Sequence, residues 1–399
     1  MKARWRRGFV LFLCLSLLLT GCWNSRELNT LAIVSGLGID KLDNQEGYRV
    51  SFQIVLPSST SSKPESSVGG AGIIINTATD KTLFGALRKA SKKTSRQLFF
   101  AHCQLVILGE ELAKDGLGTV FDIFERSHEL RLNTAVLVSR GTDAASILKI
   151  LLPADNVPSI GVVKKNQITS KVWGENNSVD VMEVIQQLTG EGDTIISGVR
   201  IIGDKEGGKK KKDLEQTELP SVVVMSGMGV FKKGKLTRWV DGHEARGTLT
   251  VLDKLKETVV NIDNQDQAEA IAVNIFSSKT NVKVSMRGGV PHFQVSILEE
   301  GNITETKLDV NLSDRKTIAI LERKLEKKTK DEVIRTIQAA QEKESDPFKF
   351  GNELKRAHPA EWKKVGENWD SAFASGVLDV AVEAHIRTTG MRLNPYSAK

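Results

Sequence analysis

Residues 31–40 read Leu-Ala-Ile-Val-Ser-Gly-Leu-Gly-Ile-Asp, and residues 48–54 read Tyr-Arg-Val-Ser-Phe-Gln-Ile. In the second stretch every other side chain is apolar, and this period of two is typical of a half-buried strand. Residues 43–47, Asp-Asn-Gln-Glu-Gly, have the composition of a turn. We therefore predict an antiparallel hairpin at the start of the folded body.

Strands and helices are expected to interleave after this hairpin. A helical pattern starts at Asp80, and the periodicity weakens after residue 160 until a short helix is expected at 179–188. The strands predicted in between are 104–108 and 134–138, and the helices are 116–125 and 143–152.

The second half of the chain shows the same mixture of periods. Strands are predicted at 222–225, 229–231, 236–240, 271–276, 282–286, 293–298, 304–310 and 380–386, and helices at 244–256 and 315–343. The buried stripe expected for the long helix is Ile318, Leu321, Leu325, Ile334 and Ile337.

Length and composition predict a folded body of more than one domain. The chain has 399 residues, of which 40% are hydrophobic and 26% charged, which argues against a disordered or multi-pass membrane chain. Single hydrophobic cores stop growing near about 250–300 residues, so two or three domains are expected. We place the domain boundaries near residues 194 and 264, the second at a polar break in the sequence.

The first 21 residues have the form of a signal peptide. A basic start is followed by the apolar run Gly8–Leu19, which is too short to span a bilayer. The run ends in Leu-Thr-Gly-Cys at 19–22, which resembles the lipobox of bacterial lipoproteins, so we expect Cys22 to become the acylated N-terminus. The alternative is an ordinary secretory signal with an incidental cysteine.

Charge and cysteine usage fit an exported protein without disulfides. Removing residues 1–21 takes away four basic side chains and no acidic one, which lowers the net charge from +7 to +3. A net charge of +3 is too small to indicate a nucleic-acid partner. Cys14 leaves with the signal peptide and Cys22 is consumed by lipid, so Cys103 is left without a partner.

Two stretches approach catalytic motifs without completing them. Residues 229–236 resemble a phosphate-binding loop, but Leu236 stands where a hydroxyl must bind magnesium, and a hairpin turn explains the stretch better. His243-Glu244 begins like a zinc-protease motif, but the second histidine is replaced by Gly247. We interpret Asp241 and Glu244 as a capping box that starts a helix.

The remaining candidates are also expected to be structural. Adjacent residues on a strand point to opposite faces, so His102 and Cys103 cannot share a proton, and Cys103 is predicted to be buried. Trp362 and Trp369 fall on one helical face and are predicted to be core, with a ligand pocket as the alternative. Asp346 is predicted to cap a helix. No catalytic, metal-binding or cofactor-binding residue is assigned.

Several separated blocks, in the same order, resemble the C-subunit lipoproteins of bacterial spore germinant receptors, the Ger(x)C family. The opening block runs from the lipobox through Trp23-Asn-Ser-Arg-Glu-Leu-Asn29, where the family commonly has an acidic residue at Asn24. The opening block continues with Ala32–Asp40. The central block consists of Gly227–Lys232 and Trp239–Gly247. The third block consists of Asp346–Gly351, His358–Trp362 and Asn368-Trp369, and closes with Val380–Gly390.

The resemblance implies a lipid-anchored, non-enzymatic subunit on the outer face of the spore inner membrane, which acts with two integral-membrane subunits, A and B. It implies no metal and no cofactor, and only Cys22 receives a role. The fold implied is α+β in three domains, each a mixed or mainly antiparallel sheet packed with helices. With the boundaries above, these are residues 22–194, 195–264 and 265–399, after a signal peptide at 1–21.

Two other functions call for features that the sequence does not show. A substrate-binding lipoprotein of a transporter should show two similar repeats around a cleft, and no internal duplication is visible. A cell-wall hydrolase should carry a metal or triad motif, and neither is found. The Lys209–Lys212 run is interpreted as an exposed loop, with binding to anionic lipid headgroups as the alternative.

Overall fold

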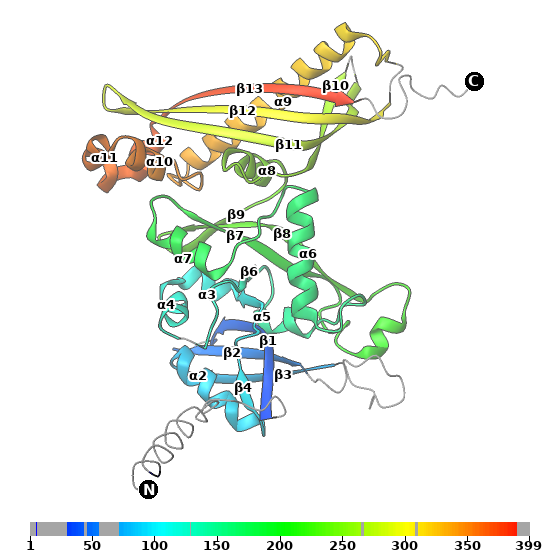
Figure 1. Ribbon diagram of the computed structural model, residues 1–399, viewed down its shortest axis with the longest axis vertical. Coiled ribbons are helices and arrows are strands. Elements are labelled where there is room, and N and C mark those ends of the chain that lie inside the picture. The colour runs from blue at the N-terminus through cyan, green and yellow to red at the C-terminus, as the bar shows by residue number, and fades with distance from the viewer. Residues whose placement is uncertain are drawn as a thin grey trace.

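A computed structural model describes residues 5, 30–43, 46–55, 72–127, 129–264, 267–307 and 310–388. Within these residues the chain forms a nine-stranded sheet and a four-stranded sheet, which lie one beyond the other along the long axis of the molecule (Figure 1). Helices pack on both sheets, which confirms the α+β class.

The nine-stranded sheet is built from the first part of the chain. Its strands are β1 (Leu31–Lys41), β2 (Tyr48–Val55), β3 (Ile73–Asp80), β4 (Gln97–Phe99), β5 (Leu105–Leu108), β6 (Ala135–Ser139), β7 (Thr194–Gly203), β8 (Ser221–Lys232) and β9 (Lys235–Val240). The helices of this part are α2 (Leu83–Lys89), η4 (Ala90–Lys93), α3 (Glu110–Asp115), α4 (Gly118–Arg126), α5 (Ala144–Lys149), α6 (Pro158–Val172), α7 (Val181–Thr189) and η5 (Lys211–Glu215).

The strand order of this sheet is β3-β2-β1-β5-β6-β7-β8-β9, with β4 beside β1. The β1–β2 hairpin is antiparallel, as predicted, and β1, β5, β6 and β7 run parallel to one another. Side chains of β5 and β6 are buried on both faces because helices cover both. One face packs on α2, α3, α4 and α7, and the other on α5 and α6.

The four-stranded sheet has the order β10-β11-β12-β13. Its core lies on one face, under a long helix and a group of short ones, and the alternating burial along β12 leaves the other face exposed. The elements are α8 (Gly242–Val251), β10 (Thr258–Asn264), β11 (Gln267–Arg287), β12 (Val290–Thr306), α9 (Arg315–Gln341), α10 (Phe350–Ala357), α11 (Pro359–Val365), η6 (Gly366–Asn368), α12 (Trp369–Ala374) and β13 (Val377–Thr388).

The number of sheets differs from the expectation. In the described residues, 195–264 do not form a sheet of their own, because β7 pairs in parallel with β6 and in antiparallel with β8, so that β7, β8 and β9 extend the first sheet. β10 instead pairs with β11 in the second sheet. The domain boundaries near residues 194 and 264 stay a prediction, since a continuous sheet does not decide where folding units end.

Helix α6 is the longest of the described elements that the sequence did not indicate; β3 and β7 were also not predicted. Most of the buried positions of α6 are small or polar, among them Ser159, Gly161 and Asn166, so it lacks the apolar stripe that would mark it. The Ser159 amide donates to Gln53 Oε1 at 2.9 Å, and Asn176 Nδ2 donates to Asn166 Oδ1 at 2.8 Å. This helix is therefore held in place largely by hydrogen bonds and by small side chains that let neighbouring segments come close to its backbone.

Trp362 and Trp369 join the core of the second sheet, as predicted, and Val365 and Phe373 join it with them, although a 3₁₀ turn separates α11 from α12. The two indole rings lie 5.4 Å apart between centroids. Within the described residues, none of the helices has the length and apolar composition needed to cross a bilayer.

Candidate functional site: the polar contacts between the two sheets

The described chain passes once from the first sheet to the second, through α8. Figure 1 shows α8 between the two sheets, beneath β11 and above β9. Three groups of polar side chains lie at this passage. We call them the Asp241 contact, the Glu332 contact and the Asp346 contact, after the carboxylate at the centre of each.

The Asp241 contact joins the start of α8 to the first sheet. Arg140 Nη1 and Nη2 donate to the two Asp241 carboxylate oxygens at 2.6 and 2.9 Å, and the guanidinium lies 4.8 Å from the centre of the Trp239 ring. Trp239 Nε1 in turn donates to Glu110 Oε1 at 3.1 Å. The central sequence block thus holds the edge strand β9 against β6 and α3.

The capping box expected from Asp241 and Glu244 does not form. Asp241 is the N-cap residue of α8, but its carboxylate bonds to Arg140, and no side-chain cap is made. Glu244 pairs instead with Arg238. The local motif was overridden because two arginines from the neighbouring sheet offer stronger, charge-assisted partners.

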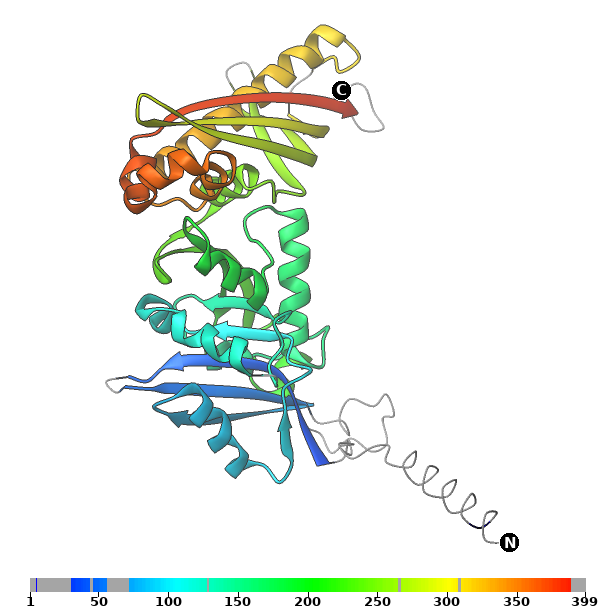
Figure 2. The ribbon, with the colours of Figure 1, turned by 60° about the vertical axis from the view of Figure 1, so that its left-hand side comes forward.

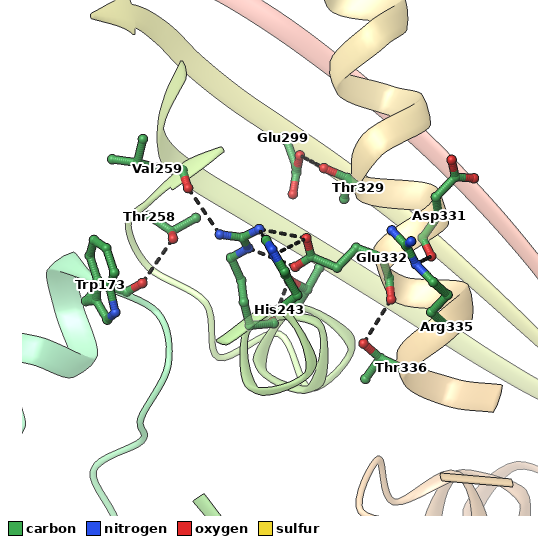
Figure 3. Close-up of polar contacts among 12 residues, drawn as sticks. Trp173, His243, Thr258, Val259, Glu299, Thr329, Asp331, Glu332, Arg335 and Thr336 are labelled. Atoms are coloured by element: carbon green, nitrogen blue, oxygen red, sulfur yellow. Dashed lines mark hydrogen bonds and ion pairs between the residues drawn. The ribbon is translucent and has the colours of Figure 1, made fainter. Parts of the chain in front are cut away.

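The Glu332 contact joins α8 to α9 (Figure 3). Arg246 Nε and Nη2 donate to the two Glu332 oxygens at 2.8 and 2.6 Å, and Arg246 Nη1 donates to the Val259 carbonyl at 3.1 Å. His243 Nδ1 lies 3.2 Å from Glu332 Oε2. The side chains of Arg246 and Glu332 are only 12% and 8% exposed, so water screens this pair little.

Gly247, where the zinc motif fails, has a packing role. A Cβ atom on Gly247 would lie 2.3 Å from Thr336 Oγ1 and 3.0 Å from Thr336 Cβ. Only glycine therefore allows α8 to approach α9 this closely, and the approach brings Arg246 to Glu332. The close packing of the two helices therefore explains why a glycine occupies position 247.

A second carboxylate lies buried close to the Glu332 contact. Glu299 on β12 accepts a hydrogen bond from Thr329 Oγ1 at 2.9 Å, and Figure 3 shows the two side chains pointing at each other. Burial, with a smaller contribution from the nearby Glu332, raises the pKa of Glu299 from 4.5 to about 7, against the opposing effects of the Thr329 hydrogen bond and Arg246. Glu299 is therefore a carboxyl group that changes charge near neutral pH.

The Asp346 contact gathers residues that are separated in the third sequence block. The Asp346 carboxylate accepts hydrogen bonds from the amides of Phe350 and Gly351 at 3.1 and 2.8 Å and from Trp369 Nε1 at 2.9 Å. The carboxylate therefore accepts from the first two amides of α10, as a cap would, but Asp346 is not the N-cap residue: Lys349 holds that position, and the helix begins at Phe350. The Asp346 carbonyl also accepts from the Asp193 amide at 2.7 Å, which ties this cluster to the loop before β7.

Two further ionisable groups adjoin Asp346. Asp193 accepts a hydrogen bond from Ser345 Oγ at 2.5 Å, and burial raises its pKa to about 6, with Asp346 adding to the rise. Burial lowers the pKa of Lys349 to about 8, against the attraction of Asp346 and Asp193. Lys349 Nζ has no hydrogen-bond partner among the described residues, and the backbone at Lys349 is left-handed, with φ of 66°.

The other sequence candidates lie apart from these contacts. Cys103 is buried, its Sγ lies 3.5 Å from the Leu105 carbonyl, and burial raises the pKa of its thiol to about 12, which confirms a structural cysteine. Residues 229–236 form the β8–β9 hairpin, as predicted. Among the described residues, no group of three or more histidine, cysteine, aspartate or glutamate side chains could hold a metal ion.

Two predicted features are not placed at the contacts. Cys22 lies outside the described residues, so its lipidation stays a prediction. The Lys209–Lys212 run forms turns leading into η5, with Lys209 paired to Glu206 at 2.8 Å and Lys210, Lys211 and Lys212 on or near the surface. The run belongs to the β7–β8 connection, as an exposed loop.

Sequence reasoning missed Glu332, the acidic partner of Arg246. The apolar stripe of α9 continues from Leu321 and Leu325 onto Thr329, Glu332 and Thr336, all buried. Glu332 falls on the same face of the helix as Leu321 and Leu325, and this position could have indicated a buried ion pair, because a charged residue is rarely buried without a partner. Arg140 and Asp193 carried no comparable signal, since each is brought to its partner by sheet topology.

Comparisons with known proteins agree with this architecture. The family model described as "Spore germination protein N-terminal domain" matches residues 24–201, and the one described as "Spore germination B3/ GerAC like, C-terminal" matches residues 226–390. The crystal structure of the GerBC protein superposes with a TM-score of 0.56 at 21% identity, over 88% of this chain and 97% of that one, so the fold is shared.

Among curated relatives, spore germination protein KC of Bacillus subtilis (strain 168) is 33% identical over 97% of this chain and 96% of its own length. Spore germination protein B3 of the same organism is 26% identical over 94% of this chain and 95% of its own length. The matches run through both sheets and the contacts between them, and on this ground the chain belongs to the Ger(x)C family of spore germination proteins.

Proposed function

We propose that the chain is the lipid-anchored, non-enzymatic C subunit of a spore germinant receptor. A lipid on Cys22 holds it on the outer face of the spore inner membrane, where it assembles with the integral-membrane A and B subunits in the response to nutrients. The observation that carries the proposal is the 33% identity to spore germination protein KC over 97% of the chain.

The chemistry of the contacts supports a role in assembly. The polar residues of the matched blocks use their hydrogen bonds to join α8 to both sheets and the Asp346 loop to β7. The one thiol among the described residues is buried and holds its proton. Such a body suits a subunit that acts by binding neighbours.

A lipid anchor would make this binding effective without high intrinsic affinity. Two or more acyl chains give stable membrane attachment, whereas a single chain gives only marginal attachment. Confinement to the membrane surface raises the effective concentration of the folded body around integral-membrane partners. Assembly should therefore depend on the anchor more than on any single protein contact.

The anchor is tested by the Cys22→Ala variant, with Cys103→Ala as the matched control that removes a cysteine elsewhere. We expect the Cys22→Ala protein to be lost from the spore membrane fraction and the spores to germinate poorly in nutrients, while the control keeps both properties. Normal fractionation and normal germination of Cys22→Ala spores would contradict the proposal.

Assembly is tested by crosslinking intact spores and identifying the captured proteins by mass spectrometry. We expect integral-membrane germination subunits to be captured by the wild-type chain and not by the Cys22→Ala variant. Capture of transporter permeases instead would favour the alternative, a substrate-binding lipoprotein.

A further inference from the structure

One end of the molecule carries a run of positive charge. Residues 81–97 contain six basic and no acidic side chains, and they form α2, η4 and the turn into β4. In Figure 1, α2 and β4 lie at the end of the molecule farthest from the second sheet, and Figure 2 places the same blue segments at that end.

Two of these six charges have internal partners. Arg88 pairs with Glu129 at 3.2 Å and stacks on the Phe84 ring, and Lys89 pairs with Asp80 at 2.5 Å. Lys81 lies beside an apolar pocket. The remaining three, Lys92, Lys93 and Arg96, are exposed, and among the described residues no carboxylate pairs with them. We call these three residues the basic end surface.

The topology of the sheet brings the basic end surface to the membrane anchor. β4 pairs with β1 in parallel, with Gln97 opposite Leu31, so the chain that enters β1 arrives next to Arg96. Leu31 follows Cys22 by nine residues. Nine extended residues span at most about 30 Å, so an acylated Cys22 keeps this end of the molecule within about 30 Å of the bilayer.

We propose that Lys92, Lys93 and Arg96 bind the anionic headgroups of the membrane in which Cys22 is anchored. The inference rests on the lipid anchor of the proposed function and adds the face that meets the membrane. Contact at this end directs the second sheet, with its exposed strand face, away from the bilayer. Each basic residue close to an anionic surface strengthens binding by about fivefold, and salt screens the attraction.

A fluorescent probe at Ser95, between Lys93 and Arg96, tests the contact in the full lipidated chain. Cys103 is buried with its thiol protonated, so a Ser95→Cys variant offers its introduced thiol to the label without competition from Cys103. The labelled protein is reconstituted into vesicles that contain a quencher-bearing lipid, either with phosphatidylglycerol or with phosphatidylcholine alone. A Ser313→Cys label, just before α9, reports on the opposite part of the molecule.

We expect quenching of the Ser95 label by about twofold or more in phosphatidylglycerol vesicles, reversal in 0.5 M salt, and little quenching at Ser313. The K92E/K93E/R96E variant should lose the quenching. The R323E/K327E/K330E variant changes three exposed charges on α9 by the same amount and should keep it. Vesicle flotation is measured on every sample.

Flotation separates failure of the two proposals. If the lipidated chain floats with both kinds of vesicle but the Ser95 label is unquenched, or is quenched equally without anionic lipid, the basic end surface does not bind headgroups, and a protein partner becomes the explanation for its charge. If the chain does not float with either vesicle, the lipid anchor itself fails, and this inference fails with it.

Discussion

The guanidinium of Arg246 and the carboxylate of Glu332 form a buried, two-point ion pair that fixes α8 to α9. The pair crosses from the central matched block to the helix that covers the second sheet. Removing one partner of a buried pair leaves the other charge without compensation, which typically costs about 3–5 kcal/mol. Loss of this pair should therefore weaken the packing of α8 on α9 more than loss of any other contact between the two helices.

We expect Arg246→Ala to lower the free energy of unfolding by about 3–5 kcal/mol, measured by urea unfolding. Arg323→Ala, which removes an exposed arginine from α9, is the control and should change it by no more than about 0.5 kcal/mol. The double variant R246M/E332L should recover most of the loss, because an apolar pair leaves no buried charge. Equal effects of the buried and exposed substitutions would refute the assigned role.

The close approach of Gly247 to Thr336 predicts a non-additive pair of substitutions. Alanine is ordinarily favoured over glycine inside a helix by about 1 kcal/mol. At this position we expect Gly247→Ala to destabilise the protein, because its Cβ would lie 2.3 Å from Thr336 Oγ1. Adding Thr336→Ala removes that oxygen and should restore part of the stability. A double-mutant cycle measured by thermal unfolding checks this, and additive effects would count against the contact.

Glu299 makes stability depend on pH. Its pKa is about 7 in the folded protein and near 4.5 when unfolded, so between these values the folded state holds a proton that the unfolded state has released. The free energy of unfolding should therefore fall as the pH rises from about 4.5 through 7. Asp193, with a pKa of about 6, acts in the same direction.

The Glu299→Gln variant should flatten this dependence and exceed the wild type in stability above pH 7. Glu305→Gln, at an exposed position of the same strand, is the control and should leave the profile unchanged. Thermal unfolding at half-unit steps from pH 4.5 to 8 measures the effect. An unchanged slope in Glu299→Gln would mean that Glu299 is not the responsible group.

Asp346 should be the critical residue of its contact, since its carboxylate serves two amides and the Trp369 indole. Each buried donor left without an acceptor costs about 1–3 kcal/mol, so we expect Asp346→Ala to cost about 3 kcal/mol or more. Tryptophan fluorescence during urea unfolding follows the loss. Asp331→Ala, an exposed aspartate on α9, is the control, and a similar loss there would argue against specific capping by Asp346.

Local patterns predicted most elements but not their assembly. The alternation at residues 48–54 and the stripe at Leu321 and Leu325 identified a strand and a helix because burial repeats with the backbone period. The same reasoning failed for α6, whose buried face is small and polar. It also divided β11 and β12 into separate pieces, because half-exposed polar residues interrupt the alternation along these long strands.

Partners distant in sequence explain the remaining differences. The Asp241 carboxylate could either cap α8 or pair with Arg140. The neighbouring sequence indicates only the cap, because Arg140 is distant along the chain. The continuity of the first sheet from β6 to β7 rests on Val138 and Ser139 pairing with Gly198 and Val199, a register that no local motif encodes. Lipidation of Cys22 stays a prediction because that residue lies outside the described part of the chain.

The single passage of the described chain between the sheets gives the molecule one covalent joint. If one sheet turned against the other, the backbone would have to flex only around α8. The turn would be resisted by polar contacts that include the Arg246–Glu332 ion pair, the hydrogen bond from the Asp193 amide to the Asp346 carbonyl and the Lys355–Glu191 ion pair. A rotation between the sheets would then strain the side chains that form these contacts. Substitutions that strengthen or weaken these contacts would therefore change how readily the two sheets turn against each other.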